Sequence, residues 1–145
     1  ESELTTENRI LGIEAGLLAG YRLFDNEVVA GQGFALNLNV AQNVQVGFTG
    51  ATLTGAAVTD IYGMLRIGYF ITPSLGFNIS VGSGTFGGGA ATPSIGAGVF
   101  FDAFTSRSTD SFSTALKVKL DYLTDTTRGM TSGTIAFGLA GVFGL

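Results

Sequence analysis

The 145-residue chain contains no cysteine and no histidine. Without cysteine it has no disulfide framework and no thiolate nucleophile, and without histidine it lacks most zinc sites and every acid–base mechanism that uses imidazole. Charged residues make up only 12% of the chain, whereas about 25% is usual in a soluble domain. The net charge of −4 argues against a nucleic-acid-binding surface, which would be basic. These absences exclude most classes of enzyme, and we expect no metal or cofactor.

Long apolar runs are also missing, although 46% of the residues are hydrophobic. The longest weakly polar stretch, Ile135 to Leu145, is shorter than the roughly 18 consecutive apolar residues that a membrane-spanning helix needs. Only Pro73 and Pro93 interrupt the chain, while clusters of Gly, Asn, Asp, Ser and Thr recur along it. Such spacing, at about 12 to 20 residues, is typical of an all-β protein.

Between these clusters the residues alternate between a bulky apolar face and a small or polar face, which is the period of a β-strand. In the first segment Ile13 and Leu17 fall on one face, and Glu14 and Arg22 on the other. Gln32 would join the apolar face if the second strand began at residue 28, so we predict that this strand begins near residue 33. The eight predicted strands cover residues 11–23, 33–40, 44–49, 61–71, 75–82, 94–103, 112–122 and 134–143.

An even number of strands can close into a barrel and remove the exposed edges of an open sheet. The apolar face carries too many bulky side chains for the interior of an eight-stranded barrel, so we expect it to point outward, into lipid. Tyr21, Tyr69 and Tyr122 lie on this face near strand ends, where tyrosine is common at membrane interfaces. The sequence therefore predicts a tail over residues 1–8 and, over residues 9–145, an all-β, eight-stranded antiparallel up-and-down transmembrane β-barrel.

Seven charged side chains fall on the face that would line the lumen. They are Glu14, Arg22, Arg66, Asp102, Lys117, Lys119 and Asp121. Four are positive and three negative, and we expect them to pair, because unpaired charges in a narrow lumen are costly. We predict in particular that Glu14 meets Lys117 and Lys119, because only the strand over residues 134–143 separates them and its inward residues are small. The many inward glycines leave a second interpretation open, a polar path through the barrel.

Other motifs are weaker candidates for chemistry. Gly82, Gly84 and Gly87 match the dinucleotide pattern G-x-G-x-x-G, but no helix is predicted after them, so we interpret the segment as a hairpin loop. Ser80 with Lys117 would be a conceivable nucleophile and base, and the inward carboxylates a conceivable acid–base pair. Polar groups inside a barrel need no reaction to explain them, and we expect the protein not to be an enzyme.

Two features of the sequence are typical of a known group of proteins. One is the alternation, and the other is a last strand whose outward residues are Phe137, Leu139, Phe143 and Leu145. The chain is similar to the small eight-stranded β-barrels of the bacterial outer membrane, such as the transmembrane domain of outer membrane protein A and outer membrane proteins X and W. The resemblance implies a monomer in the outer membrane, in contact with lipid or detergent, that is inserted by the outer-membrane assembly machinery and has both ends in the periplasm. Leu145 stands where such barrels usually end in phenylalanine.

The function expected from the sequence is that of an integral outer-membrane barrel with a structural or surface role and at most a narrow polar pore. Two alternatives remain open at this point. One is a porin-like channel for water, ions or small solutes, and the other is a soluble ligand-binding β-barrel, which requires the inner and outer faces to be exchanged.

Overall fold

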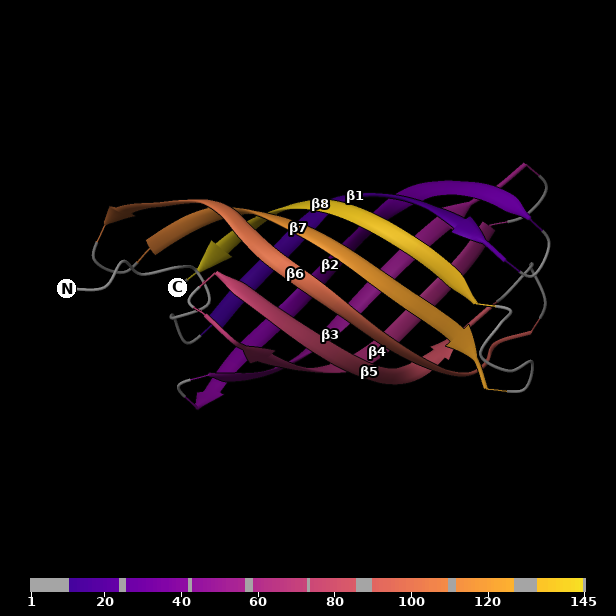
Figure 1. Cartoon of the computed structure of the whole chain (residues 1–145), viewed down its shortest axis with the longest axis horizontal. Coiled ribbons are helices and arrows are strands. Elements are labelled where there is room, and N and C mark those ends of the chain that lie inside the picture. The colour runs from indigo at the N-terminus through magenta and orange to yellow at the C-terminus, as the bar shows by residue number, and fades with distance from the viewer. Residues whose placement is uncertain are drawn as a thin grey trace.

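Eight strands form one closed antiparallel barrel (Figure 1). The structure, a computed structural model, describes residues 11–23, 26–41, 43–56, 59–72, 74–85, 90–109, 112–126 and 133–144. The strands are β1 (Leu11–Arg22), β2 (Glu27–Ala41), β3 (Val44–Thr54), β4 (Thr59–Phe70), β5 (Leu75–Gly84), β6 (Thr92–Thr109), β7 (Phe112–Asp125) and β8 (Thr134–Gly144). Each strand pairs with its neighbours in sequence, and β8 pairs with β1. The predicted fold class is confirmed. No helix within the described ranges is long and apolar enough to cross a membrane.

Several strands are longer than the alternation predicted. β2 begins at Glu27 rather than near residue 33, β3 continues to Thr54, and β4 begins at Thr59. The prediction that β2 starts near residue 33 is therefore wrong. It was made to keep Gln32 off the outward face, but Gln32 lies within β2 and points outward. β6 continues to Thr109, whereas the strand predicted here ended at residue 103. The predicted tail over residues 1–8 lies outside the described residues.

The pairing register fixes the tilt of the strands. A ladder of directly paired residues runs through Leu11, Leu38, Val46, Ile67, Ile79, Ala97, Tyr122 and Ile135 and returns to β1 at Tyr21. One circuit thus ends ten residues further along β1 than it began. With about 3.3 Å per residue and about 4.8 Å between strands, this shift tilts the strands by about 40° from the barrel axis.

The polarity of the inner and outer faces is the reverse of that in an ordinary soluble protein. Leu17 is 71% exposed and Val28 is 74% exposed, whereas Glu14, Arg22 and Lys117 are each no more than 1% exposed. The bulky apolar side chains therefore point outward, as the sequence predicts, and the charged side chains point into the lumen.

The register also gives the depth of each outward residue. Each residue along a strand rises about 2.5 Å along the axis, and each step to the next strand in order rises about 3 Å. Measured from Leu11, most of the outward apolar side chains then lie in a band about 25 Å tall, with Tyr69 near its lower edge and Tyr21 at its upper edge. Gln32 lies about 18 Å up, close to the level of Tyr122.

Close packing inside the barrel depends on glycine at particular positions. A Cβ atom added to Gly76 would lie 2.5 Å from Cζ of Phe100 and 2.6 Å from the carbonyl oxygen of Tyr69. At Gly141, on the outer face, the nearest atom would be 3.9 Å away. The Phe100 ring, which is buried and packs edge-on to Phe70 at 5.1 Å, thus needs a bare backbone beside it.

We predict that Gly76→Ala lowers the free energy of unfolding by about 1–3 kcal/mol, because the ring or the strand must move. The matched substitution Gly141→Ala meets open space, and we expect it to leave stability unchanged or to raise it by about 0.4–1 kcal/mol. Urea unfolding followed by circular dichroism measures both. Equal unfolding midpoints for the two variants would contradict the packing argument.

Candidate functional site

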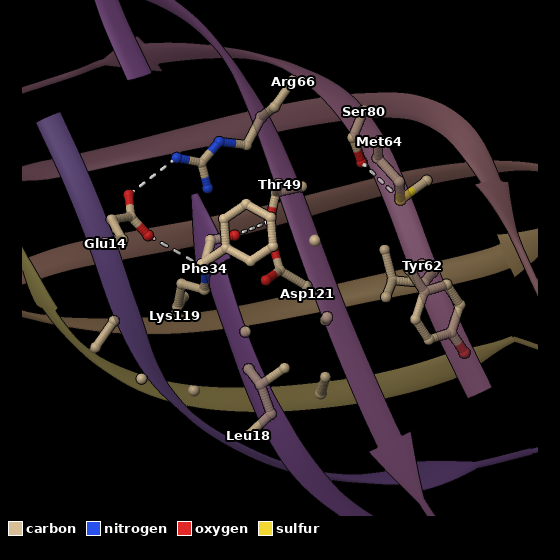
Figure 2. A pocket seen from close by; sticks show the side chains of 18 of the residues that line it. Glu14, Leu18, Phe34, Thr49, Tyr62, Met64, Arg66, Ser80, Lys119 and Asp121 are labelled. Atoms are coloured by element: carbon tan, nitrogen blue, oxygen red, sulfur yellow. Dashed lines mark hydrogen bonds and ion pairs between the residues drawn. The ribbon is translucent and has the colours of Figure 1, made fainter. Parts of the chain in front are cut away.

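The lower half of the lumen is built around one carboxylate, that of Glu14 on β1. Its Oε2 lies 2.8 Å from Nζ of Lys117 and 3.0 Å from Nη2 of Arg66, and its Oε1 lies 3.3 Å from Nζ of Lys119. Figure 2 shows Arg66 and Lys119 converging on Glu14 from different strands. The structure therefore brings together four of the seven predicted lumen charges, and both predicted lysine contacts are present.

Amide side chains complete this cluster. Asn37 on β2 donates from Nδ2 to Oε2 of Glu14 at 2.8 Å and accepts from Arg66 at 2.7 Å. Arg66 also lies 3.4 Å from Oε1 of Gln45, and the Lys117 ammonium sits 4.5 Å from the centre of the Phe100 ring. Charges removed from water are tolerated when they are both paired and hydrogen-bonded. The cluster meets both conditions for Glu14.

Small residues on β8 make these contacts possible. β8 lies between β1 and β7, and its inward positions include Ala136, Gly138 and Ala140. A Cβ atom on Gly138 would lie 3.3 Å from Cγ of Lys119 and 2.8 Å from Cδ2 of Leu18. A larger side chain at this position would therefore occupy the path by which Lys119 reaches Glu14.

The remaining predicted lumen charges lie elsewhere. Asp102 is buried on β6 directly opposite Lys117, and Asp121 lines the cavity above Glu14 together with Lys119. Arg22 is at the other end of the barrel, where Nη1 lies 2.5 Å from Oδ2 of Asp60 and Nη2 lies 3.6 Å from Oε1 of Glu27. Arg22 therefore belongs to a second, separate ion cluster.

The sequence analysis missed the partners of Arg22. Asp60 is fully buried on β4 and Glu27 begins β2, but both positions had been assigned to loops. The alternation itself could have found Asp60, since it continues the inward series of Tyr62, Met64 and Arg66 by one more step. Asn37 lay on the inward face of a predicted strand, yet an uncharged amide gave no signal that it would join the ion network.

An apolar cluster separates the two ion clusters. Val29, Leu53 and Tyr62 are buried together, and Leu18, Ala51 and Leu123 pack against them. These side chains come from five strands and meet inside the lumen. They fill the lumen at this level, and the sequence did not predict this cluster.

Between the Glu14 cluster and this apolar cluster lies a small cavity. Its volume is about 50 Å³, and its lining includes the polar side chains of Arg66, Asn78 and Asp121. Leu18 and Tyr62 also line it, and Figure 2 shows them with Arg66 and Asp121. A polar cavity needs at least roughly 10–15 Å³ of such volume to hold one water molecule. The space suits a few water molecules and no larger ligand.

The other candidate groups have structural contacts. The Ser80 hydroxyl donates to Sδ of Met64 at 3.8 Å, while Lys117 points to Glu14. Gly82 and Gly84 belong to β5, and Gly87 lies outside the described residues. Across the described ranges, no three His, Cys, Asp or Glu side chains are grouped so as to hold a metal ion.

The three outward tyrosines lie at both ends of the barrel. The Tyr21 hydroxyl donates to Asn26 at 3.0 Å, and the Tyr122 hydroxyl accepts from the Gly133 amide at 3.1 Å. Tyr69 packs against Phe77, with ring centres 5.7 Å apart. The Tyr69 and Tyr21 rings thus lie near the lower and upper edges of the apolar band, and the Tyr122 ring lies in its upper third.

We predict strong energetic coupling within the Glu14 cluster. Glu14→Ala should destabilise the barrel by about 3–5 kcal/mol, because it leaves three buried cations without their shared partner. Adding Lys117→Met to this variant should cost less than Lys117→Met does alone. A double-mutant cycle by urea unfolding measures the coupling, and the same cycle between Glu14 and Arg22 serves as the control that should be additive. Additivity of Glu14 with Lys117 would refute the network.

Comparison with known proteins supports the fold. No family model and no curated protein sequence matches the chain. Among solved structures, the chain is similar to one described as "De novo design of transmembrane beta-barrels", with 17% sequence identity, 98% of each chain covered and a TM-score of 0.55. The chain thus shares the fold of a transmembrane β-barrel over nearly its whole length.

Proposed function

We propose that the protein is an integral β-barrel of the bacterial outer membrane with a closed lumen, and that it has a structural or surface role without enzymatic activity. The observation that carries this proposal is the reversal of polarity, in which bulky apolar side chains cover the outside while charged side chains fill the inside. An outward apolar band about 25 Å tall matches the hydrocarbon layer that such barrels cross.

The exposure of the outward apolar side chains also supports the membrane assignment over the soluble alternative. A soluble ligand-binding barrel presents charge to water and keeps its apolar side chains for the interior. Here Leu65, Ile79 and Val81 are each more than half exposed. In water such a surface would drive aggregation, whereas in lipid it is the favoured arrangement.

The packing of the lumen supports a structural role over that of a channel. The Glu14 cluster and the apolar cluster of Val29, Leu53 and Tyr62 follow one another along the axis, and the cavity between them has a volume of only about 50 Å³. A solute would have to displace both. A narrow channel remains the second candidate, favoured by this cavity and by the inward glycines around it.

Absence of enzymatic activity is part of the same proposal. The chain offers neither histidine nor cysteine, and the Ser80 hydroxyl is turned toward the Met64 sulfur. Assembly by the outer-membrane machinery and a monomeric state also belong to this proposal.

Spin labels test the orientation of the barrel wall in lipid. Since the chain has no cysteine, Ile79→Cys and Ser80→Cys each give a single labelling site, and the two neighbours point outward and inward at mid-band. We expect oxygen dissolved in lipid to relax the label at position 79 strongly and the label at position 80 weakly. Access of an aqueous nickel complex to position 79 in vesicles would contradict a membrane-facing surface.

Planar-bilayer recordings test whether the lumen is closed. We expect the refolded protein to give no channel events, and Glu14→Ala to remain closed because the apolar cluster still blocks the lumen. Combining Glu14→Ala with Leu53→Ala and Tyr62→Ala should produce conductance, while Leu53→Ala with Tyr62→Ala alone should not. Steady conductance of the unmodified protein would instead favour the channel.

A further inference from the structure

The outer wall carries at least two hollows that the closed-lumen proposal does not use, and the larger of them has polar side chains at its border. It lies across β1 to β4 with a volume of about 730 Å³, and this size falls in the range of small-molecule sites. The outward side chains around it are Leu17, Gln32, Phe34, Phe48, Thr52 and Ile61. Apart from Gln32 and Thr52, these side chains are apolar.

Small residues and tilted rings create this hollow. Ala15 and Gly50 line it and contribute almost no side chain to the outer surface. The Phe34 ring leans over Gly50, where an added Cβ atom would lie 2.7 Å from Cε1 of the ring. Phe34 and Phe48 pack together at 6.1 Å with a tilt of 46°. The two rings are therefore held to one side and form a wall of the hollow.

Gln32 and Thr52 form a polar rim at the upper end of the hollow. They are directly paired across β2 and β3, and within the described part of the chain no hydrogen bond involves either side chain. By contrast, Thr54 and Thr59, nearer the end of the barrel, bond to each other at 3.0 Å. The register places Gln32 about 18 Å and Thr52 about 21 Å up a band about 25 Å tall.

An apolar hollow below two neutral hydrogen-bond donors matches the shape of one ligand class. In a bilayer, acyl chains occupy the hydrocarbon layer and their ester carbonyls lie at its edge. A polar side chain facing hydrocarbon without a partner is costly. The rim lies about 4 to 7 Å below the upper edge of the band, and an ester carbonyl drawn down to it would accept from both groups. The rim carries no charge, so it selects the ester region rather than a charged headgroup.

We propose that this hollow is a lipid site, which binds one acyl chain of a diacyl phospholipid and holds its ester carbonyl through the Gln32 amide and the Thr52 hydroxyl. This inference rests on the proposed membrane insertion. A second copy of the chain is the other conceivable occupant, but the hollow is concave and its rim is matched to isolated acceptors.

Single tryptophans report occupancy, because the chain contains no tryptophan of its own. Leu17→Trp places the reporter beside the hollow. Val81→Trp places a control on β5, at about the same depth, beside the second outer hollow of about 640 Å³, whose outward side chains are all apolar. The folded protein in detergent micelles is titrated with phosphatidylcholine brominated in its acyl chains. We expect quenching at position 17 to saturate at one lipid per barrel, and quenching at position 81 to rise in proportion to the lipid fraction.

Matched variants test the geometry of the site. Ala15→Phe fills the hollow and should weaken the saturable quenching by about tenfold, whereas the same substitution at the outward Ala97 on β6 should not change it. Gln32→Leu should weaken it by about fivefold, the effect of losing one hydrogen bond, and Thr52→Val gives a second, nearly isosteric check of the rim.

The outcomes separate this inference from the proposed function. Equal, non-saturating quenching at positions 17 and 81 would overturn the lipid site while leaving membrane insertion intact. Failure of both reporters to be quenched in vesicles of the brominated lipid would instead refute insertion. Cross-linked dimers that disappear with Ala15→Phe would also overturn the lipid site and assign the hollow to a second copy.

Discussion

Closure of the sheet between β1 and β8 is the constraint on which every other feature depends. The pairing of Tyr21 with Ile135 leaves no unpaired strand edge and sets a shift of ten residues per circuit. That shift determines the tilt of the strands, the height of the apolar band and the depth of each side chain. It also determines which inward residues share a level. The ion clusters and the apolar cluster are thus consequences of one register.

The lumen shows how a narrow interior accommodates charge. Arg66, Lys117 and Lys119 surround one glutamate, while Asp102 and Asp121 lie on the neighbouring walls. Three cations and three anions leave this half of the lumen without net charge. Glycine and alanine on β8 give the long side chains the room to converge. Small side chains are therefore as much a part of the network as the charged groups themselves.

The two-residue alternation was enough to predict the barrel, the direction of each face and the meeting of Glu14 with Lys117 and Lys119, because each depends only on parity and strand order. Other features depend on the shift in register between strands, which the alternation does not show. Gln32 seemed misplaced when its position was counted along its own strand, yet the tilt places it in the upper third of the apolar band. Asp60 and Glu27 were missed because polar residues near strand ends resemble loops. The cluster around Tyr62 joins residues from five strands, and no single segment reveals it.

The Glu14 cluster has a further consequence for how the chain reaches its final form. The hydrogen bond between Glu14 and Lys117 spans 103 residues of sequence, and β1 finds its last partner only when β8 is complete. Contacts so distant in sequence form late, since the loop that they close costs much conformational entropy. Until then the basic residues of β4 and β7 face an open sheet without their shared carboxylate. Ion pairing in the lumen therefore accompanies closure itself, which makes the last step of assembly a cooperative one.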